Sequence, residues 1–177
     1  MKKLSVVIPV YYNEGSLPEL FAELMRVEDI LRRSRGMELE LIFVDDGSGD
    51  NSFAELMKIK QIRPDTCVVK LARNFGAIHA VKTGLQYVTG DCFTMLAADL
   101  QDPPELLVEM ADKWLAGSKF VICVRESRQD PLLSKAFARL YYGILRLTVT
   151  KTYPSGGFDL ALMDELLLPY QIGRAHV

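Results

Sequence analysis

The chain has 177 residues, of which 49% are hydrophobic and 25% are charged. This composition can form a buried core and argues against a disordered chain. The formal net charge of −2 argues against a nucleic-acid-binding protein, which normally carries a basic excess. The cysteines lie in apolar runs without a metal-ligand partner nearby, and we expect buried, reduced thiols at Cys67, Cys92 and Cys123.

Short β-branched runs alternate with longer amphipathic stretches along the chain. We expect strands over residues 4–10, 39–44, 66–71, 91–96, 119–124 and 158–163. We expect helices over residues 17–35, 51–63, 76–88, 103–116 and 132–149. Ser16 is the expected N-cap of the first helix, and Pro64 follows the end of the second. The alternation predicts an α/β fold with a mostly parallel sheet flanked by helices, which binds ligands at the carboxyl ends of its strands.

No expected helix reaches the ~20 apolar residues that a membrane span needs. The apolar run at residues 4–10 is too short for a signal peptide and contains Pro9.

Two carboxylates, Asp45 and Asp46, directly follow the second expected strand. Adjacent carboxylates repel each other unless a cation or a donor-rich ligand satisfies them. One of them could therefore accept hydrogen bonds from a nucleobase edge or from ribose hydroxyls. An ordinary turn, with Asp46 capping the next helix, explains the same residues equally well.

The segment AADLQDPPE at residues 97–105 follows the fourth expected strand. Asp99, Gln101 and Asp102 place oxygen atoms close together there, and Mg²⁺ and Mn²⁺ prefer such ligands. A metal ion at this point could bridge a diphosphate and neutralise its charge. We expect Asp99 to bind the metal, and Asp102 to cap the helix that the two following prolines begin.

Arginines follow the third and fifth expected strands, namely Arg73, Arg125 and Arg128. Any single arginine is more often a solvated surface charge, but guanidinium groups facing one acidic edge favour phosphate binding. The two histidines, His79 and His176, lack a metal-ligand partner in the sequence, and we expect structural or surface roles for them.

Three other classes of protein do not match these motifs. A dinucleotide-binding dehydrogenase would carry G-x-G-x-x-G after the first strand, where this chain has PVYYNEG. A P-loop nucleotidase would need G-x-x-x-x-G-K-[ST], which does not occur. A phosphoacceptor signalling domain would need an aspartate after the third strand, where the chain has LAR.

The motifs taken together resemble the family 2 glycosyltransferases, in particular the polyprenyl-phosphate sugar transferases. The matching segments are SVVIPVYYNE, IFVDDGSGDNS, LARNFG, ADLQDPPE and the segment at Arg125, in order from residue 5 to about 128. The resemblance implies a GT-A (Rossmann-like) fold and an inverting transfer that uses a UDP- or GDP-sugar and Mg²⁺ or Mn²⁺. For nucleotide-sugar binding we assign Pro9, Tyr11, Glu14, Asp46, Arg73, Ala98, Asp99 and Arg125, and for the metal Asp99 and Gln101.

Two positions depart from the family pattern. The acidic pair Asp-x-Asp begins here with Ala97, so that only Asp99 remains of it. The family's Gly-Asp-Phe is replaced by a sequence with Gly157 at the aspartate position. Asp159 lies two residues further on, and residues i and i+2 of a strand share a face. We therefore assign a catalytic role to Asp159, together with Arg125.

The resemblance also implies a polyprenyl phosphate as acceptor. Lys135 and Arg139 could hold its phosphate group. They lie on the expected helix 132–149, which either rests on a membrane surface or covers the sheet as an ordinary amphipathic helix. We expect the protein to lie in the cytoplasm at the inner face of the cell membrane, where a missing C-terminal segment would hold it. We expect it to take part in cell-envelope synthesis. Oligomerisation stays open.

We expect a single catalytic domain over residues 1–170, truncated at its C-terminus, and an irregular or non-native tail over residues 171–177. The leading function is metal-dependent transfer of a sugar to polyprenyl phosphate. The alternatives are transfer to a growing polysaccharide and a non-catalytic nucleotide-sugar-binding domain.

Overall fold

The computed structural model describes residues 1–124 and 160–171. The strands are β1 (Lys2–Val10), β2 (Met37–Asp45), β3 (Cys67–Lys70), β4 (Cys92–Met95), β5 (Phe120–Cys123) and β6 (Leu160–Asp164). The helices are α1 (Leu17–Arg35), α2 (Ser52–Ile62), α3 (Ala77–Leu85), α4 (Leu106–Leu115), the short 3-10 helix η1 (Glu165–Leu167) and α6 (Leu168–Gln171). The predicted helix 132–149 lies outside the described residues.

The strands form one sheet in the order β3-β2-β1-β4-β6-β5. β1 pairs in parallel with β2 and β4, and β2 pairs in parallel with β3, whereas β6 runs antiparallel to β4. The predicted mostly parallel sheet is therefore confirmed. Along the chain, β2 and β3 are added on one side of β1, and β4 is then added on its other side. The connections that follow β1 and β4 therefore lead toward opposite edges of the sheet. Sheets of this type bind ligands in the crevice that such a reversal leaves at the carboxyl ends of the strands.

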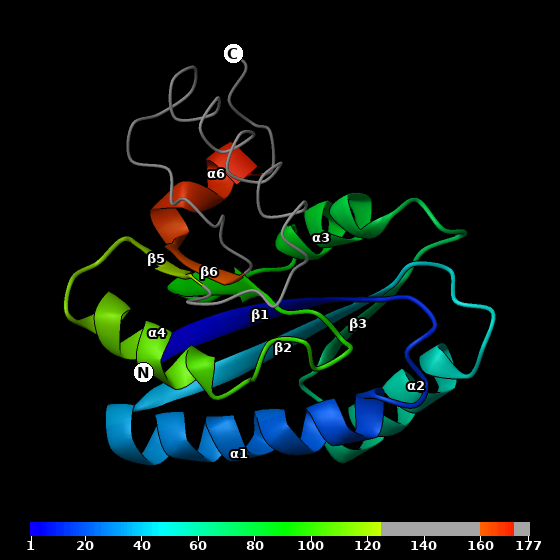
Figure 1. Ribbon diagram of the computed structural model, residues 1–177, viewed down its shortest axis with the longest axis horizontal. Coiled ribbons are helices and arrows are strands. Elements are labelled where there is room, and N and C mark those ends of the chain that lie inside the picture. The colour runs from blue at the N-terminus through cyan, green and yellow to red at the C-terminus, as the bar shows by residue number, and fades with distance from the viewer. Residues whose placement is uncertain (125–159, 172–177) are drawn as a thin grey trace, which may run out of the picture. The chain divides into compact units, whose positions relative to one another are not determined.

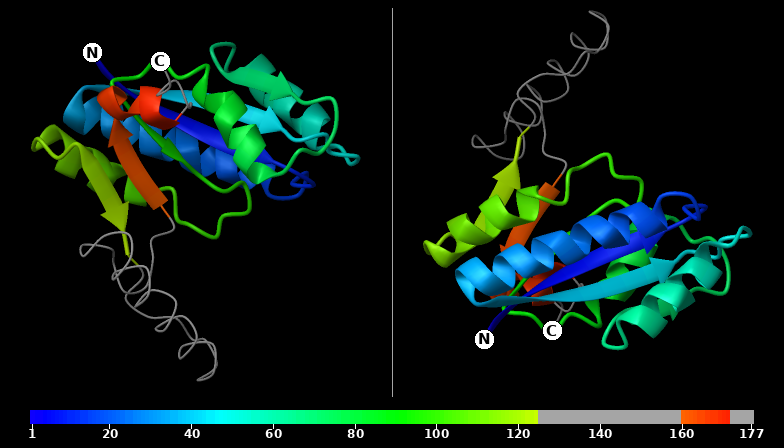
Figure 2. Two further views of the ribbon diagram at one scale, coloured as in Figure 1. Left: turned by 90° about the horizontal axis from the view of Figure 1, so that it is seen from above. Right: turned by 90° about the horizontal axis from the view of Figure 1, so that it is seen from below.

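Helices cover both faces of the sheet (Figures 1 and 2). α1 contacts α2 and α4 on one face, and α3 packs on the other face against β1 and β2. The close approach of α3 depends on Gly84, because a Cβ atom there would collide with the Val7 side chain and lie 3.0 Å from Val44 Cγ2. The position of α3 matters for function, because its first turn reaches the carboxyl ends of the strands.

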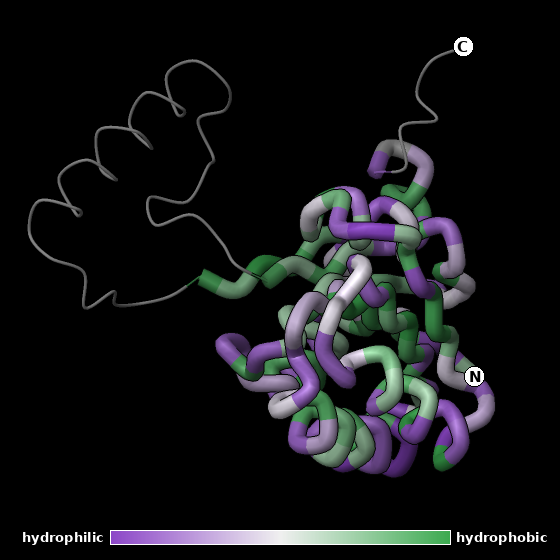
Figure 3. Tube along the Cα trace, turned by 90° about the vertical axis from the view of Figure 1, so that its right-hand side faces the viewer, coloured by the Kyte–Doolittle hydropathy of each residue, from purple (hydrophilic) through white to green (hydrophobic). Residues whose placement is uncertain are grey.

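The core lies between the sheet and these helices. Every residue of β2 from Leu41 to Asp45 is buried, as is every residue of β1 from Leu4 to Ile8. Figure 3 shows α1 alternating between hydrophobic and hydrophilic along its coil, as expected of a helix with one face against a sheet. By their contacts the described residues Met1–Val121 and Leu162–Gln171 form one compact unit, and the described residues 122–124 and 160–161 belong to another. The sites discussed below belong to the first unit.

Two predicted helix caps differ from the structure. Ser16 occupies the N-cap of α1, but its hydroxyl makes no capping bond and instead donates to the Ala98 carbonyl at 2.7 Å. The prediction that Asp102 caps the next helix is wrong, because α4 begins at Leu106 with Glu105 at its N-cap. A residue that precedes proline disfavours helical dihedrals, which makes Pro103 a poor first residue for a helix.

The cysteines are all free thiols, as predicted, but only one of them is fully buried. Cys92 is buried, and burial raises its pKa to about 12. Cys67 and Cys123 are half-buried, which corrects the expectation for those two. Within residues 1–124 and 160–171, no helix is long and apolar enough to cross a membrane.

Asp164, at the end of β6, anchors the connection between α4 and β5. Its buried carboxylate accepts hydrogen bonds from Lys119 Nζ at 2.8 Å and from the Trp114 indole nitrogen at 2.9 Å. The bond from Lys119, more than any other partner, lowers the pKa of Asp164 below its ordinary value, although burial opposes this. A carboxylate with a lowered pKa stabilises the fold above its unfolded pKa of about 3.9, and this contribution is lost as the pH falls through the folded pKa.

Asp164→Asn is therefore expected to lower the free energy of unfolding at pH 7 by about 1.5–3 kcal/mol, the range for hydrogen bonds to a charged group. Below pH 4 the difference from the wild type should shrink. Urea unfolding at a series of pH values measures this. Asp112→Asn is the control, since its partner Arg35 lies with it at the surface and the change should cost less. A constant difference across the whole pH range would contradict the assignment.

Candidate functional site

A cleft of about 320 Å³ opens at the carboxyl ends of β1, β2 and β4. Its volume lies in the range of small-molecule sites. The lining residues are Pro9, Val10, Tyr11, Asn13, Asp46, Asn74, Gly76, Ala77, Ala97, Ala98 and Asp99. The structure thus brings together five of the predicted site residues, namely Pro9, Tyr11, Asp46, Ala98 and Asp99.

The connection after β1 presents aromatic rings at this end of the sheet. Tyr11 and Tyr12 are about half exposed, and their rings meet edge to face with centroids 4.7 Å apart. Tyr12 has a left-handed backbone with φ of 56°, and its N–H donates to Ser48 Oγ at 3.2 Å. The Asn13 N–H donates to Ser52 Oγ at 2.8 Å. Ser48 of the connection after β2 and Ser52, the first residue of α2, therefore hold the backbone that carries Tyr11 at the cleft.

Asp46 joins the connection after β2 to the connection after β3. Its Oδ1 accepts the Phe75 N–H and its Oδ2 accepts the Gly76 N–H, both at 2.8 Å. The side chain is buried, yet Asp46 also lines the cleft. The alternative role as a helix cap is wrong, because Asn51 is the N-cap of α2. A carboxylate oxygen has more than one acceptor site, so Asp46 can still accept a hydrogen bond from a ligand.

Gly47 allows the same two connections to touch. Its φ is +71°, and a Cβ atom at this position would lie 2.5 Å from the backbone carbon of Arg73 and 2.8 Å from Asn74 N. These are backbone atoms, so they cannot move aside as the end of a flexible side chain would. Gly47 is therefore required both by its dihedral and by its neighbours.

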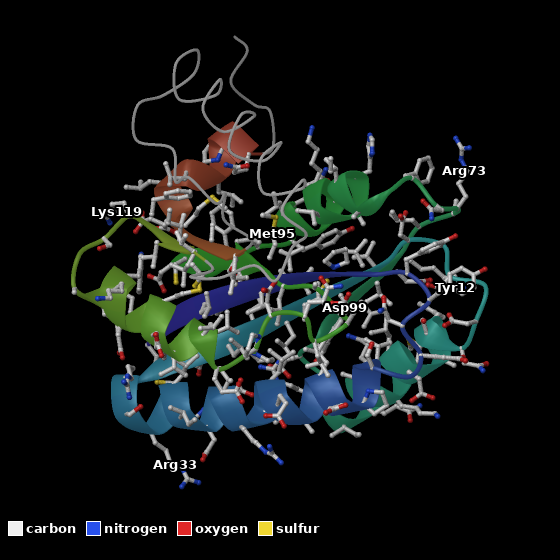
Figure 4. The ribbon with its side chains drawn as sticks, viewed as in Figure 1. Tyr12, Arg33, Arg73, Met95, Asp99 and Lys119 are labelled. Carbon is white, nitrogen blue, oxygen red and sulfur yellow. The ribbon has the colours of Figure 1, made fainter. Side chains whose placement is uncertain are left out.

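Asp99 lies on the connection after β4, exposed in the wall of the cleft (Figure 4). Its Oδ1 accepts the Gln101 N–H at 3.2 Å. The hydroxyl of Ser16 holds the preceding carbonyl, that of Ala98, at 2.7 Å, which fixes this connection to the start of α1. The carboxylate is thus neither buried in apolar packing nor paired with a lysine in any ion pair of the described residues.

The ligand chemistry around Asp99 fits a metal only in part. Among the residues that the structure describes, no group of three His, Cys, Asp or Glu side chains could hold an ion. Ala97 lines the cleft where the family pattern has a second carboxylate. Mg²⁺, however, is often bound through one or two carboxylates and takes its other ligands from water and substrate phosphates. One exposed carboxylate beside a cleft is compatible with that mode of binding.

Three predicted residues do not line the cleft. Glu14 Oε2 accepts the Asn51 N–H at 2.7 Å and so serves the connection after β2. The Arg73 guanidinium lies 4.7 Å from the centre of the Phe75 ring and points outward, away from Asp99 (Figure 4). Gln101 is exposed beyond Asp99. The structure does not place these side chains against a ligand in the cleft.

No binding role was predicted for Asn13, Asn74, Gly76 and Ala77, which also line the cleft. The motif RNFG indicated the segment that contains Asn74, but the prediction assigned binding to Arg73, and the structure places Asn74 in the cleft instead. The assignments of Arg125, Arg128, Lys135, Arg139, Asp159 and His176 lie outside the described residues. His79 is exposed on α3, as expected for a surface histidine.

Comparisons with known proteins identify the family and the fold of this chain. The family model described as Glycosyl transferase family 2 matches residues 5–173. An uncharacterized glycosyltransferase of Synechocystis sp. is 40% identical over 164 residues, which cover 92% of this chain and 50% of that protein. The undecaprenyl-phosphate 4-deoxy-4-formamido-L-arabinose transferase of Klebsiella pneumoniae is 37% identical over 152 residues, covering 85% and 45%. The chain therefore spans about half the length of these relatives.

Two solved structures have the same fold. A mannosyltransferase of Pyrobaculum calidifontis, solved with GDP-Man and Mn²⁺, has a TM-score of 0.63 at 23% identity and covers 96% of this chain and 46% of its own. The glucosyl-3-phosphoglycerate synthase of Mycobacterium tuberculosis has a TM-score of 0.62 at 22% identity, covering 97% and 63%. These likenesses confirm the predicted GT-A fold. By sequence and by fold, the chain belongs to glycosyl transferase family 2.

Proposed function

We propose that this chain binds a UDP- or GDP-sugar in the cleft and supplies the donor side of a metal-dependent, inverting transfer to polyprenyl phosphate. The observation that carries the proposal is the exposed Asp99 carboxylate in a cleft at the strand ends of a family 2 chain. The acceptor class is supported by the name of the 37% identical relative from Klebsiella pneumoniae, an undecaprenyl-phosphate sugar transferase.

The nucleotide would lie between the connections after β1 and β2. The Tyr11 ring, 47% exposed in the cleft wall, offers a flat surface for the base. Stacking of a base on an aromatic ring contributes about 1–3 kcal/mol. Asp46 offers an acceptor to a base N–H or to a ribose hydroxyl, and its bonds to Phe75 and Gly76 fix its orientation before the donor arrives.

The diphosphate would lie at the connection after β4. Mg²⁺ or Mn²⁺ held by Asp99, with Gln101 beside it, would neutralise charge on the departing diphosphate. Arg125 is assigned to the same diphosphate. Arg73 would need a different side-chain rotamer to join it, because in the structure it lies over the Phe75 ring.

On the acceptor side, a phosphate oxygen attacks the anomeric carbon from the face opposite the diphosphate. The new carbon–oxygen bond forms as the bond to the nucleotide diphosphate breaks, which inverts the configuration. A lipid phosphate has a second pKa near 6 and is mostly ionised at neutral pH, so it needs orientation more than a base. We assign that orientation to Lys135 and Arg139, and we assign to Asp159 a catalytic role on the acceptor side. The reaction would take place at the cytoplasmic face of a membrane.

Titration calorimetry with UDP, GDP and their sugars, with and without Mn²⁺, tests the proposal. We expect one of the two nucleotides to bind at least tenfold more tightly with Mn²⁺ than without it, because the ion joins the Asp99 carboxylate to the diphosphate. Free UMP or GMP, which lacks the diphosphate, is the control and should show a much smaller effect of Mn²⁺. Equal affinity with and without the ion would contradict metal-dependent donor binding.

A non-catalytic nucleotide-sugar-binding domain is the second candidate, favoured by Ala97 at the position of the missing carboxylate. Tight, Mn²⁺-dependent binding of a donor without any turnover would support it. Transfer to a growing polysaccharide is the alternative within the enzyme class, and product analysis with lipid and oligosaccharide acceptors distinguishes the two.

A further inference from the structure

A second cavity, of about 300 Å³, lies beside α3 and is mostly apolar. We call it the α3 groove. Its lining residues are Ala77, Ile78, Val81, Lys82, Leu85, Met95 and Gln171. Ile78 is 72% exposed at this groove and contributes to a continuous apolar lining. Burying this surface against another apolar molecule would be favourable.

α3 and the segments that flank it along the chain contain cationic but no acidic residues. Residues 66–90 contain Lys70, Arg73 and Lys82 but no aspartate or glutamate, although the whole chain has a net charge of −2. Lys82 is the charged residue among those that line the groove. An apolar surface with the cation Lys82 at its edge suits an amphiphile with an anionic head and disfavours a cationic partner.

The α3 groove is continuous with the cleft. Ala77, the first residue of α3, lines both cavities. β4 connects them as well, because Met95 lines the groove and Asp99 lines the cleft four residues later (Figure 4). Four residues of fully extended chain span at most about 14 Å. A single molecule can therefore have its head in the cleft and its apolar part in the groove.

We propose that the α3 groove binds the hydrocarbon chain of a polyprenyl phosphate whose phosphate group enters the cleft. This inference rests on the proposed function, and it adds a binding site for the lipid part of the acceptor. Each buried methylene group contributes about fourfold to affinity, so a few isoprene carbons in the groove would dominate binding over the phosphate alone.

Equilibrium dialysis of labelled farnesyl phosphate with the 177-residue chain tests the proposal, with inorganic phosphate as the headgroup-only probe. We expect farnesyl phosphate to bind the wild type at least a hundredfold more tightly than inorganic phosphate. Ile78→Glu should weaken farnesyl phosphate binding tenfold or more, because it places a carboxylate in the groove. Ile62→Glu is the matched control, since Ile62 is 73% exposed at the end of α2 and should change nothing.

A photoreactive farnesyl phosphate analogue gives a second readout, with adducts expected on α3 or Met95. Wild-type affinity in Ile78→Glu, or equal losses in both variants, would overturn the proposal. So would failure of the wild type to bind farnesyl phosphate, and Mn²⁺-dependent donor binding would then still stand. If instead donor binding fails but farnesyl phosphate binding remains sensitive to Ile78→Glu, the groove is supported and the donor assignment falls.

Discussion

Asp99→Asn is expected to remove the gain in donor affinity that Mn²⁺ provides, a loss of about a hundredfold, or ~2.7 kcal/mol. The amide has nearly the shape of the carboxylate but no charge, and Asp99 is the acidic side chain that the connection after β4 places in the cleft wall. The backbone bond from Gln101 can still be made by the amide oxygen. Calorimetric titration of the nucleotide with and without Mn²⁺ measures the change.

Asp102→Asn is the control for this experiment, because Asp102 lies three residues further along and does not line the cleft. Its affinity for the donor should stay within about twofold of the wild type. Ala97→Asp restores the acidic pair of the family and should strengthen the effect of Mn²⁺. If Asp99→Asn keeps its Mn²⁺-dependent affinity, the assignment of the metal to Asp99 is wrong.

Gly47→Ala is expected to lower the free energy of unfolding by about 2–4 kcal/mol and to abolish measurable donor binding. A left-handed backbone costs about 1–2 kcal/mol for a residue with a Cβ atom. The new methyl group would also lie 2.5 Å from the Arg73 backbone, so the segment RNFG would have to move. That movement would break the bonds from Phe75 and Gly76 to Asp46. Urea unfolding and donor titration measure the two effects.

Gly36→Ala separates the two causes. Gly36 has a similar φ of +61° at the end of α1, but a Cβ atom there would meet nothing within 4 Å. This variant should lose only the dihedral contribution, about 1–2 kcal/mol, and should bind the donor like the wild type. If the two variants were equally stable, the contact with the Arg73 backbone would have no energetic importance.

The alternation of apolar runs was sufficient to predict the sheet, because parallel strands that are buried on both faces stay continuously hydrophobic. β1 and β2 extend beyond the predicted ranges at Lys2 and Met37, since their parallel pairing continues past the apolar residues. The reverse happened at β3 and β4, which are shorter than predicted. A hydrophobic pattern indicates which residues are buried, whereas a strand ends where the adjacent strand no longer pairs with it.

The sequence predicted which residues lie at the strand ends, but not which groups their side chains bind. Asp99 and Tyr11 follow strands and line the cleft as expected, because the ends of parallel strands meet at one edge. Glu14 also follows a strand, but its carboxylate bonds to the Asn51 N–H on a different connection. Nothing in the sequence shows which of several nearby carboxylates accept backbone N–H groups. The same difficulty left the role of Asp46 undecided between a ligand contact and a cap.

The bonds from Tyr12 and Asn13 to Ser48 and Ser52 have a consequence for how this protein can diverge. The two hydroxyls belong to the connection after β2 and to the first residue of α2, and both accept N–H groups of the connection after β1. A substitution accepted in either segment therefore alters the support of its neighbour, and a compensating change must be found there. Selection for a new donor would therefore have to change the two segments together.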